Sequence, residues 1–329
     1  MKIGIVGATG MLGNHVLRGA IEKGYKVFVI HRPKSDLAKI QGLNFTSRVG
    51  DLNDKTTLIE SLKGLDMVLN CGAYYPTIPV PLEKEMQTAR LQMENYIEAV
   101  QKANISKALY LGGSIALPKS STGIGDETLI YDHAPENKTP YVQVKWLMDK
   151  MAREAGLIVG IPSMTFGEYD YGPTTGRLAM DLANGNLPAY IQGERNIIYA
   201  GDAGRGLLLA AEKGRAGERY LLTGENTSMD NLVRLIAKVA GVEPPTKVIP
   251  LKIAKMISKY EAFKYQYLGG KLPKLSGTTI AIMSAGQFLD GSKAQKELGY
   301  TPSVSGEEAI RRAIIWFKKS AISKKATNF

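Results

Sequence analysis

Cysteine and histidine are nearly absent from this sequence. Its 329 residues contain one cysteine, Cys71, so neither an internal disulfide nor a cysteine-rich metal site can form. The three histidines (His15, His31 and His133) are scattered and lack ligand spacings such as His-Glu-x-x-His. Metal catalysis is therefore not expected, and no metal ligands are predicted.

Long apolar runs are also missing. No window approaches the roughly 18 apolar residues that a membrane-spanning helix needs. The N-terminus enters a strand-like pattern at once, without a charged leader, an apolar stretch and a cleavage site. We therefore expect a cytoplasmic protein with no integral membrane segment.

Positive charge is in excess but is not concentrated. The chain carries a formal net charge of +11, which could favour anionic partners. Lysine and arginine are nevertheless spread along the sequence, except for the cluster "KKSAISKK" at 318–325. The solvated end of a last helix explains this cluster better than lipid or nucleic-acid binding does. No nucleic-acid partner is expected.

The first half of the chain alternates short apolar runs with helical patterns. Such alternation predicts an α/β fold with a parallel, doubly wound sheet of the Rossmann type. Helices are predicted at about 11–23, 54–63, 83–103 and 140–155. The expected strands are Ile3–Val6, Val27–Ile30, Met67–Asn70, Ala108–Leu111 and Leu157–Ile161.

The regular alternation ends after Ile161. Residues 162–195 carry Gly, Pro and Tyr at irregular spacing, and 244–292 shows no clear pattern. We predict that 1–161, with about 196–225, forms a dinucleotide-binding domain. The segments at about 162–195 and 226–329 are predicted to form a smaller substrate-binding cap that interleaves with it.

A glycine-rich loop lies between the first strand and the first helix. "IGIVGATGMLGNHVL" places Gly7, Gly10 and Gly13 where backbone must approach a pyrophosphate closely, at the N-terminus of a helix. Because the loop opens the first unit of a βα chain, dinucleotide binding is favoured over a merely structural turn. The loop residues expected to bind the cofactor are Gly7, Thr9, Gly10, Met11, Leu12 and Gly13.

The spacing of this loop, Gly-x-x-Gly-x-x-Gly, resembles the opening motif of extended short-chain dehydrogenases/reductases. Within that superfamily the chain is most similar to dihydroflavonol-reductase-like proteins, 3β-hydroxysteroid dehydrogenases and sugar-epimerase-like proteins associated with hopanoid genes. The resemblance covers most of the chain and is weakest at 244–285. It implies a nicotinamide cofactor and a Ser-Tyr-Lys active site.

The end of the second strand, "VFVIHRPKSD", predicts which cofactor is preferred. A site for NAD usually places an acidic residue there, whereas a site for NADP places an arginine. Arg32 stands at this point, beside His31, and Lys34 and Ser35 follow. We predict that Arg32 holds the 2′-phosphate of NADP(H), with assistance from Lys34 or Ser35. Arg32 as a plain surface charge is the alternative.

The resemblance implies further cofactor contacts. "GDLND" matches the segment that meets the adenine, which gives Asp51 and Leu52, and "NCGAYY" matches the stretch beside the adenosine ribose, which gives Cys71, Gly72 and Ala73. Pro162 and Ser163 match the segment that meets the nicotinamide carboxamide. One departure stands out: Ala89 occupies the position of an asparagine that family members use in a water relay.

Tyrosine and lysine four residues apart occur three times, as Tyr141/Lys145, Tyr260/Lys264 and Tyr267/Lys271. Roughly 1.4 such pairs are expected by chance, so the spacing carries little weight. Position singles out the first pair. Ser114 follows a predicted strand, and Tyr141 opens the next helix, whereas the other pairs follow no strand of the sheet. The superfamily's Ser-Tyr-Lys set matches Ser114, Tyr141 and Lys145.

These residue types suit hydride chemistry. Hydride transfer to a carbonyl carbon must be accompanied by a proton on its oxygen, which a tyrosine can supply. A phenol has a pKa near 10, and a neighbouring ammonium is expected to lower it. Lys145 would also hold the nicotinamide ribose, and Ser114 would donate a second hydrogen bond to the carbonyl oxygen.

The substrate is less well defined. The residues that could line the substrate site are Tyr74, Tyr75, Ser114, Phe166, Tyr169, Tyr171, Arg177, Tyr190 and Arg195. For most of them, ordinary packing within the cap explains the pattern as well as contact with a substrate does. Arg195 matches an epimerase segment and could grip the diphosphate of a sugar nucleotide.

Three functions follow as hypotheses. The leading one is an NADPH-dependent reductase of a ketone or aldehyde. The second is an NDP-sugar epimerase or dehydratase that holds its nicotinamide tightly, and the third is a non-catalytic NADP-binding regulator. Because family members often dimerise through the helices at 83–103 and 140–155, a homodimer is possible.

Overall fold

The computed structural model describes residues 1–329 apart from 73, 76–79, 173–174, 270–276 and 327–329. Ala73, expected beside the cofactor ribose, lies outside the described residues, as does Lys271 of the third Tyr/Lys pair. Of the side chains from 277 to 279, at 281 and from 321 onward, nothing is described.

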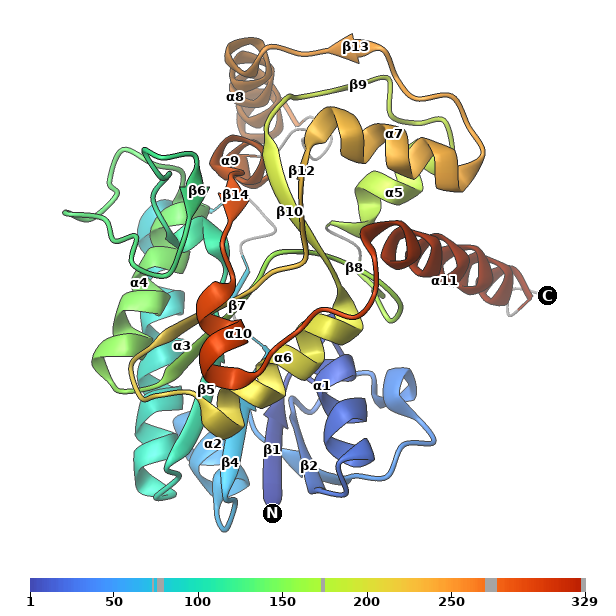
Figure 1. Ribbon diagram of the computed structural model, residues 1–329. Helices are drawn as coiled ribbons and strands as arrows, with labels where there is room; N and C mark the ends of the chain where they lie inside the picture. The colour runs from blue at the N-terminus through green and yellow to red at the C-terminus, as the bar shows by residue number, and fades with distance from the viewer. Residues whose placement is uncertain (73, 76–79, 173–174, 270–276, 327–329) are drawn as a thin grey trace.

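A parallel sheet forms the base of the molecule (Figure 1). In the described part of the chain it has seven strands in the order β11-β7-β5-β4-β1-β2-β3, and every neighbouring pair is parallel. The predicted doubly wound sheet is thus confirmed. Its strands are β1 (Lys2–Val6), β2 (Lys26–His31), β3 (Thr46–Val49), β4 (Met67–Asn70), β5 (Lys107–Leu111), β7 (Ile158–Pro162) and β11 (Arg219–Leu222).

Helices cover both faces of this sheet. On one face α1 (Met11–Glu22) packs against α6 (Ala200–Lys213), with α10 (Ser292–Leu298) beside them. The other face carries α2 (Lys55–Leu62), α3 (Leu82–Lys102) and α4 (Pro140–Glu154). The four predicted helices of the first half of the chain are confirmed to within one or two residues at each end.

The strand β3 is one that the sequence pattern did not predict. Thr46–Val49 forms the outer edge of the sheet, and its side chains are mostly exposed. An exposed edge strand needs no apolar run, so the signal that identified the inner strands is missing here.

A second layer lies above the carboxyl ends of the sheet strands. Here β10 (Glu194–Tyr199) pairs with β8 (Met164–Phe166) and β12 (Glu225–Ser228), and the three form a smaller sheet. Three helices pack on it: α5 (Gly176–Ala183), α7 (Met229–Ala240) and α11 (Gly306–Ala326). The smaller, interleaved C-terminal cap is confirmed as part of the fold.

The stretch 244–292, which showed no clear pattern, contains two further helices. They are α8 (Leu251–Tyr267) and α9 (Gly277–Ala285), and they pack against each other at the end of the molecule far from the N-terminus (Figure 1). Short pairs join distant segments here: β13 (Lys247–Val248) with β9 (Ala189–Tyr190), and β14 (Phe288–Leu289) with β6 (Ile124–Gly125). The 3-10 helices η1 (Leu37–Ile40) and η2 (Ser114–Ala116) complete the described elements.

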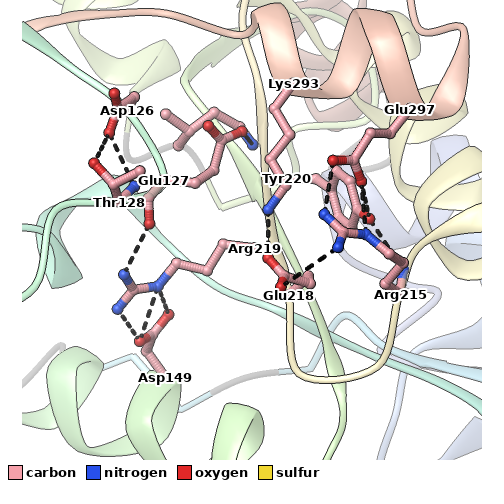
Figure 2. Close-up of polar contacts among 11 residues, drawn as sticks. Asp126, Glu127, Thr128, Asp149, Arg215, Glu218, Arg219, Tyr220, Lys293 and Glu297 are labelled. Atoms are coloured by element: carbon pink, nitrogen blue, oxygen red, sulfur yellow. Dashed lines mark hydrogen bonds and ion pairs between the residues drawn. The ribbon is translucent and has the colours of Figure 1, made fainter.

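A buried ion pair ties the last sheet strand to α4. Arg219 at the start of β11 donates from Nε to Asp149 Oδ1 (3.0 Å) and from Nη1 to the carbonyl oxygen of Leu129 (2.8 Å). Both charged side chains are at least 97% buried, and Figure 2 shows them pointing toward each other. Because Asp149 lies one helical turn after Lys145, this pair fixes the part of α4 that carries the expected catalytic residues.

Further contacts anchor the segments around this strand (Figure 2). Lys293 of α10 donates to Glu218 (2.6 Å), and Arg215 donates to Glu297 (2.7 Å). The hydroxyl of Tyr220 also donates to Glu297 (2.8 Å). These pairs are more exposed than Arg219–Asp149, so each contributes less to stability.

Replacement of Arg219 by methionine should cost ~3–5 kcal/mol of unfolding free energy, because it leaves the Asp149 carboxylate buried without its main partner. Urea unfolding followed by circular dichroism measures the loss. Lys63→Met is the matched control: Lys63 pairs with Glu60 on the surface, and its loss should cost less than ~1 kcal/mol. Equal losses in the two variants would contradict the assignment.

Candidate active site

Two adjoining cavities lie at the carboxyl ends of the sheet strands. The order of the sheet reverses between β1 and β4, which is where open α/β sheets bind ligands. The first cavity, of about 560 Å³, lies over β1 and β2, and the second, of about 300 Å³, lies over β5 and β7. Tyr75 lines both. We call them the loop cavity and the tyrosine cavity.

The glycine loop forms one wall of the loop cavity. Gly7 has a φ of 81°, and a Cβ there would lie 2.6 Å from the backbone nitrogen of Gly72. A Cβ on Gly13 would overlap the carbonyl oxygen of Gly7. The loop can therefore turn into α1 only with glycine at these points, and its backbone is free to approach a ligand closely. Gly10 is the N-cap of α1.

Most of the predicted adenosine-side residues also line the loop cavity. They include Gly7, Thr9, Asp51, Leu52 and Gly72. Of the rest of the loop, Leu12 lines the tyrosine cavity, whereas Gly10, Met11 and Gly13 line neither.

Sequence reasoning missed three polar residues of the loop cavity, Asn53, Thr88 and Gln92. Gln92 is buried, and its Nε2 donates to Asn53 Oδ1 (3.0 Å). Its Oε1 has no hydrogen-bond partner among the described residues. A buried acceptor without a partner costs free energy, so it indicates a ligand donor at this point. A glutamine one turn beyond Ala89 carries no motif that would have revealed it.

The end of β2 places positive charge at the mouth of the loop cavity. His31, Arg32 and Ser35 line it, and Lys34 does not. Arg32 is exposed, while its carbonyl oxygen accepts from the Ser35 amide (3.0 Å) and closes a tight turn. Asp36 does not line the loop cavity, and its carboxylate accepts from the Ala38 amide (3.1 Å) as the N-cap of η1.

The three expected catalytic residues meet in the tyrosine cavity. Ser114 begins η2 directly after β5, while Tyr141 and Lys145 lie one turn apart on α4. Pro140 at the first position of α4 favours the helix start, so the register of Tyr141 is fixed close to the strand ends. Neither Tyr260 nor Tyr267 lines this cavity.

Burial dominates the electrostatics of the pair. It raises the pKa of Tyr141 well above 10, with further contributions from Tyr75 and Tyr110. Burial also lowers the pKa of Lys145 to about 8. From the sequence, Lys145 is expected to lower the pKa of Tyr141, but the pKa of Tyr141 is raised instead. Burial disfavours both the phenolate of Tyr141 and the ammonium of Lys145. Tyr141 is held as a neutral phenol.

Tyr75 is the closest aromatic neighbour of Tyr141. The two rings meet edge to face with centroids 4.9 Å apart, and their hydroxyl groups interact. Because Tyr75 is less buried than Tyr141 and borders both cavities, it connects the buried phenol with the wider space of the loop cavity.

Three further predicted residues border the tyrosine cavity. Pro162 and Ser163 line it at the end of β7, and Ser163 Oγ is buried without a partner in the described structure. Cys71 lines it too, and burial raises the pKa of its thiol to about 12. The thiol is thus protonated at neutral pH, which argues against a nucleophilic cysteine.

The remaining walls of the tyrosine cavity are largely apolar. Among its described lining residues the cations are Lys145 and Arg195. Arg195 is buried, and its guanidinium donates to the carbonyl oxygens of Glu194 (2.6 Å) and Met283 (3.2 Å). The apolar walls come from Leu12, Leu111, Ile115, Met164, Ile282, Ala285 and Leu289, with the Tyr75 ring.

Six expected substrate residues do not line the tyrosine cavity. Tyr74 lines the loop cavity instead, where its hydroxyl donates to Glu85 (2.5 Å). Arg177 is exposed on α5, near Asp181. The others serve packing: Phe166 lies in the cap core, Tyr169 against His15 and Trp316, Tyr171 against Trp316, and Tyr190 beside Asp230.

The end of α9 and the residues directly after it border the cavity, and the sequence did not predict them. Ala285, Gly286 and Gln287 line the cavity, and Ala285 packs against Tyr141 and Val142 of α4. Gln287 donates to the Pro118 carbonyl (3.1 Å) and accepts from the Ser120 amide (2.8 Å), so it joins this segment to the loop after η2. Such contacts span more than 160 residues and leave no local pattern.

Metal clusters and membrane-spanning helices are both missing from the described residues. No group of three or more His, Cys, Asp or Glu side chains there could hold a metal ion. No helix in the same part of the chain is long and apolar enough to cross a membrane.

Known proteins resemble this chain over nearly its full length. Sterol demethylase protein B of Methylococcus capsulatus is 25% identical, over 96% of this chain and 98% of that protein. The decarboxylating sterol-4-alpha-carboxylate 3-dehydrogenase of Dictyostelium discoideum is 24% identical, over 93% of this chain and 98% of its own length.

A solved structure agrees with the fold. The crystal structure of a nucleoside-diphosphate-sugar epimerase from Pseudomonas aeruginosa has a TM-score of 0.84 and 36% identity, covering 97% of this chain and 98% of that chain. The family model described as the NAD dependent epimerase/dehydratase family matches residues 3–222. With its glycine loop, parallel sheet and interleaved cap, the chain belongs to the NAD dependent epimerase/dehydratase family and has the extended short-chain dehydrogenase/reductase fold.

Proposed function

We propose that the protein is an NADPH-dependent oxidoreductase that reduces a ketone or aldehyde, with Tyr141 as the proton donor. One observation carries the proposal: the tyrosine cavity joins Ser114, Tyr141 and Lys145 to walls that are mainly aliphatic and aromatic. Such walls suit an apolar carbonyl compound. The names of the two relatives, both of which refer to sterols, agree with an apolar substrate.

The residues present fit a bound dinucleotide. Gly7 and Gly13 leave the backbone open to a pyrophosphate at the start of α1. Gln92 Oε1 is free to accept from the adenine amino group, and Ser163 Oγ is free to bond the nicotinamide carboxamide. Arg32 would hold the 2′-phosphate, with Ser35 and His31 beside it. When bound, NADPH supplies the hydride.

The chain's own groups would manage the proton. Tyr141 is neutral at physiological pH because burial raises its pKa, so it can donate to the carbonyl oxygen as negative charge develops there. Ser114 would donate a second hydrogen bond to the same oxygen and orient the carbonyl. Lys145 would bond the ribose hydroxyls and stabilise the phenolate that forms.

Tyr75 would resupply the proton. Ala89 stands where relatives are expected to use an asparagine relay, so that route is missing from this chain. The hydroxyl of Tyr75 interacts with that of Tyr141, and its position between the cavities gives it access to water.

A sugar-nucleotide epimerase or dehydratase is the second candidate. Arg195 favours it, because this buried cation lines the cavity and the Pseudomonas protein is named as such an epimerase. Against it, two of the N–H groups of Arg195 already donate to backbone carbonyls.

The purified protein should consume NADPH steadily with members of a panel of apolar ketones and aldehydes. Tyr141→Phe should lower this rate by about 10²–10⁴-fold, because the proton donor is lost. Absorbance at the reduced nicotinamide band measures both.

Tyr25→Phe serves as the control, since Tyr25 bonds Glu212 at the opposite end of the sheet and should leave the rate unchanged. Interconversion of NDP-sugars without net NADPH loss would overturn the reductase proposal in favour of the second candidate.

Arg32→Ala should weaken NADPH binding by about 10–100-fold while NADH binding changes little, because a charge-assisted hydrogen bond to the 2′-phosphate is lost. Fluorescence titration with each nucleotide measures this without a substrate.

Lys34→Ala is the comparison, because Lys34 carries the same charge two residues away but does not line the cavity. If both variants lose NADPH affinity equally, general attraction rather than a contact from Arg32 explains the preference.

The value of kcat/KM for carbonyl reduction should fall as the pH rises through about 8. The pKa of Lys145 is lowered to about 8, so its ammonium is present below that pH and is lost above it. Exposed lysines stay charged to about pH 10. Rates measured from pH 6 to about 9.5 give the profile. In Lys145→Met the fall near pH 8 should vanish along with most activity, and a fall of unchanged midpoint would assign it to another group.

A further inference from the structure

Helix α8 exposes more large apolar side chains than its neighbours do. Ile253, Met256, Tyr260, Phe263 and Tyr267 are 49%, 70%, 64%, 53% and 66% exposed. They recur at intervals of three and four residues, which places them along one face of the helix. The stripe is about 21 Å long, since a helix rises ~1.5 Å per residue. Contiguous apolar surface of this kind marks an interaction site.

The rest of the molecule holds α8 by its opposite face. Ala254 and Ser258 are its buried residues, and Ala254 packs with Ile191 and Ile280. The stripe is therefore directed away from the body of the protein, where no described segment covers it. Figure 1 shows α8 at the outer end of the molecule, beyond α9.

Lysines flank the stripe. On a helical projection Lys252, Lys255 and Lys259 lie along one side of it and Lys264 along the other, and all four are exposed. With Glu261, the helix carries a formal charge of +3. An apolar face with aromatic residues, bordered by lysines, is the arrangement of helices that lie in the interface of an anionic membrane.

A second copy of this chain fits the stripe less well. The spacing would allow two such helices to pair, but the flanking lysines of one copy would then meet those of the other. Opposite charges at these flanking positions favour the pairing of helices, and like charges oppose it. An acidic surface matches the lysines, whereas a like-charged helix does not.

We propose that the outward stripe of α8 docks the protein on the surface of a lipid bilayer that contains anionic phospholipids. The apolar side chains enter the boundary between headgroups and acyl chains, and the four lysines contact the phosphates. This docking surface goes beyond the proposed function and does not depend on it. Its location is informative nonetheless, because α8 packs on α9 and Ile282 and Ala285 of α9 line the tyrosine cavity.

Sedimentation with lipid vesicles tests the proposal. The full-length protein should bind vesicles of phosphatidylcholine mixed with phosphatidylglycerol, and should bind far less to phosphatidylcholine alone or at high salt. The affinity of the double variant Met256→Gln/Phe263→Gln for these vesicles should be at least about tenfold lower than that of the wild type. Two inserted apolar side chains are lost in this variant, while the charge of the helix is kept.

Ile130→Gln is the matched control: Ile130 is 56% exposed on a different segment and should change nothing. Circular dichroism and thermal unfolding of each variant establish that it is folded. Failure of the wild type to sediment with anionic vesicles, or an equal loss in Ile130→Gln, would overturn the proposal. So would a wild-type dimer, measured by light scattering, that the double variant converts to monomers.

Discussion

Close approach of three backbone segments is the constraint on which this structure depends. The loop after β1, the start of α1 and the end of β4 meet with no room for side chains at Gly7 and Gly13. This contact sets α1 against the sheet and opens the loop cavity on the other side of the same turn. The order of the strands, which reverses between β1 and β4, then places the ends of β5 and β7 next to it. Both cavities follow from that geometry.

Burial gives the tyrosine cavity its chemical character. The protein places Tyr141, Lys145 and Arg195 where solvent is largely excluded, and no described lining residue of the cavity is an acid. By contrast, the buried Arg219 in the scaffold has its carboxylate partner within the chain. The charge of Arg219 is therefore neutralised by a carboxylate of the chain, whereas the described lining of the cavity offers Lys145 and Arg195 no carboxylate.

Local periodicity explains what could be predicted from the sequence. Strands buried on both faces are continuous apolar runs, and parallel strands end at one edge, so these patterns suffice to place Ser114 and Tyr141 together. No sequence pattern reveals where a side chain in a loop points. Tyr169 and Tyr190, for example, pack within the cap rather than in the cavity. Helix α8 escaped prediction for a related reason, because its apolar residues face outward as well as inward.

Arg195 lies between two glycines, and this links positions far apart in the sequence. A Cβ at Gly286 would overlap the guanidinium, and one at Gly193 would lie 2.8 Å from its Nη1. The guanidinium of Arg195 therefore occupies the space that a side chain at either glycine would need. A Cβ at Gly286 would also overlap the carbonyl oxygen of Glu194, so glycine is required at 286 whatever side chain stands at 195. The wall that Arg195 forms thus depends on backbone from two segments that lie about 90 residues apart in the sequence, one of which comes directly after α9.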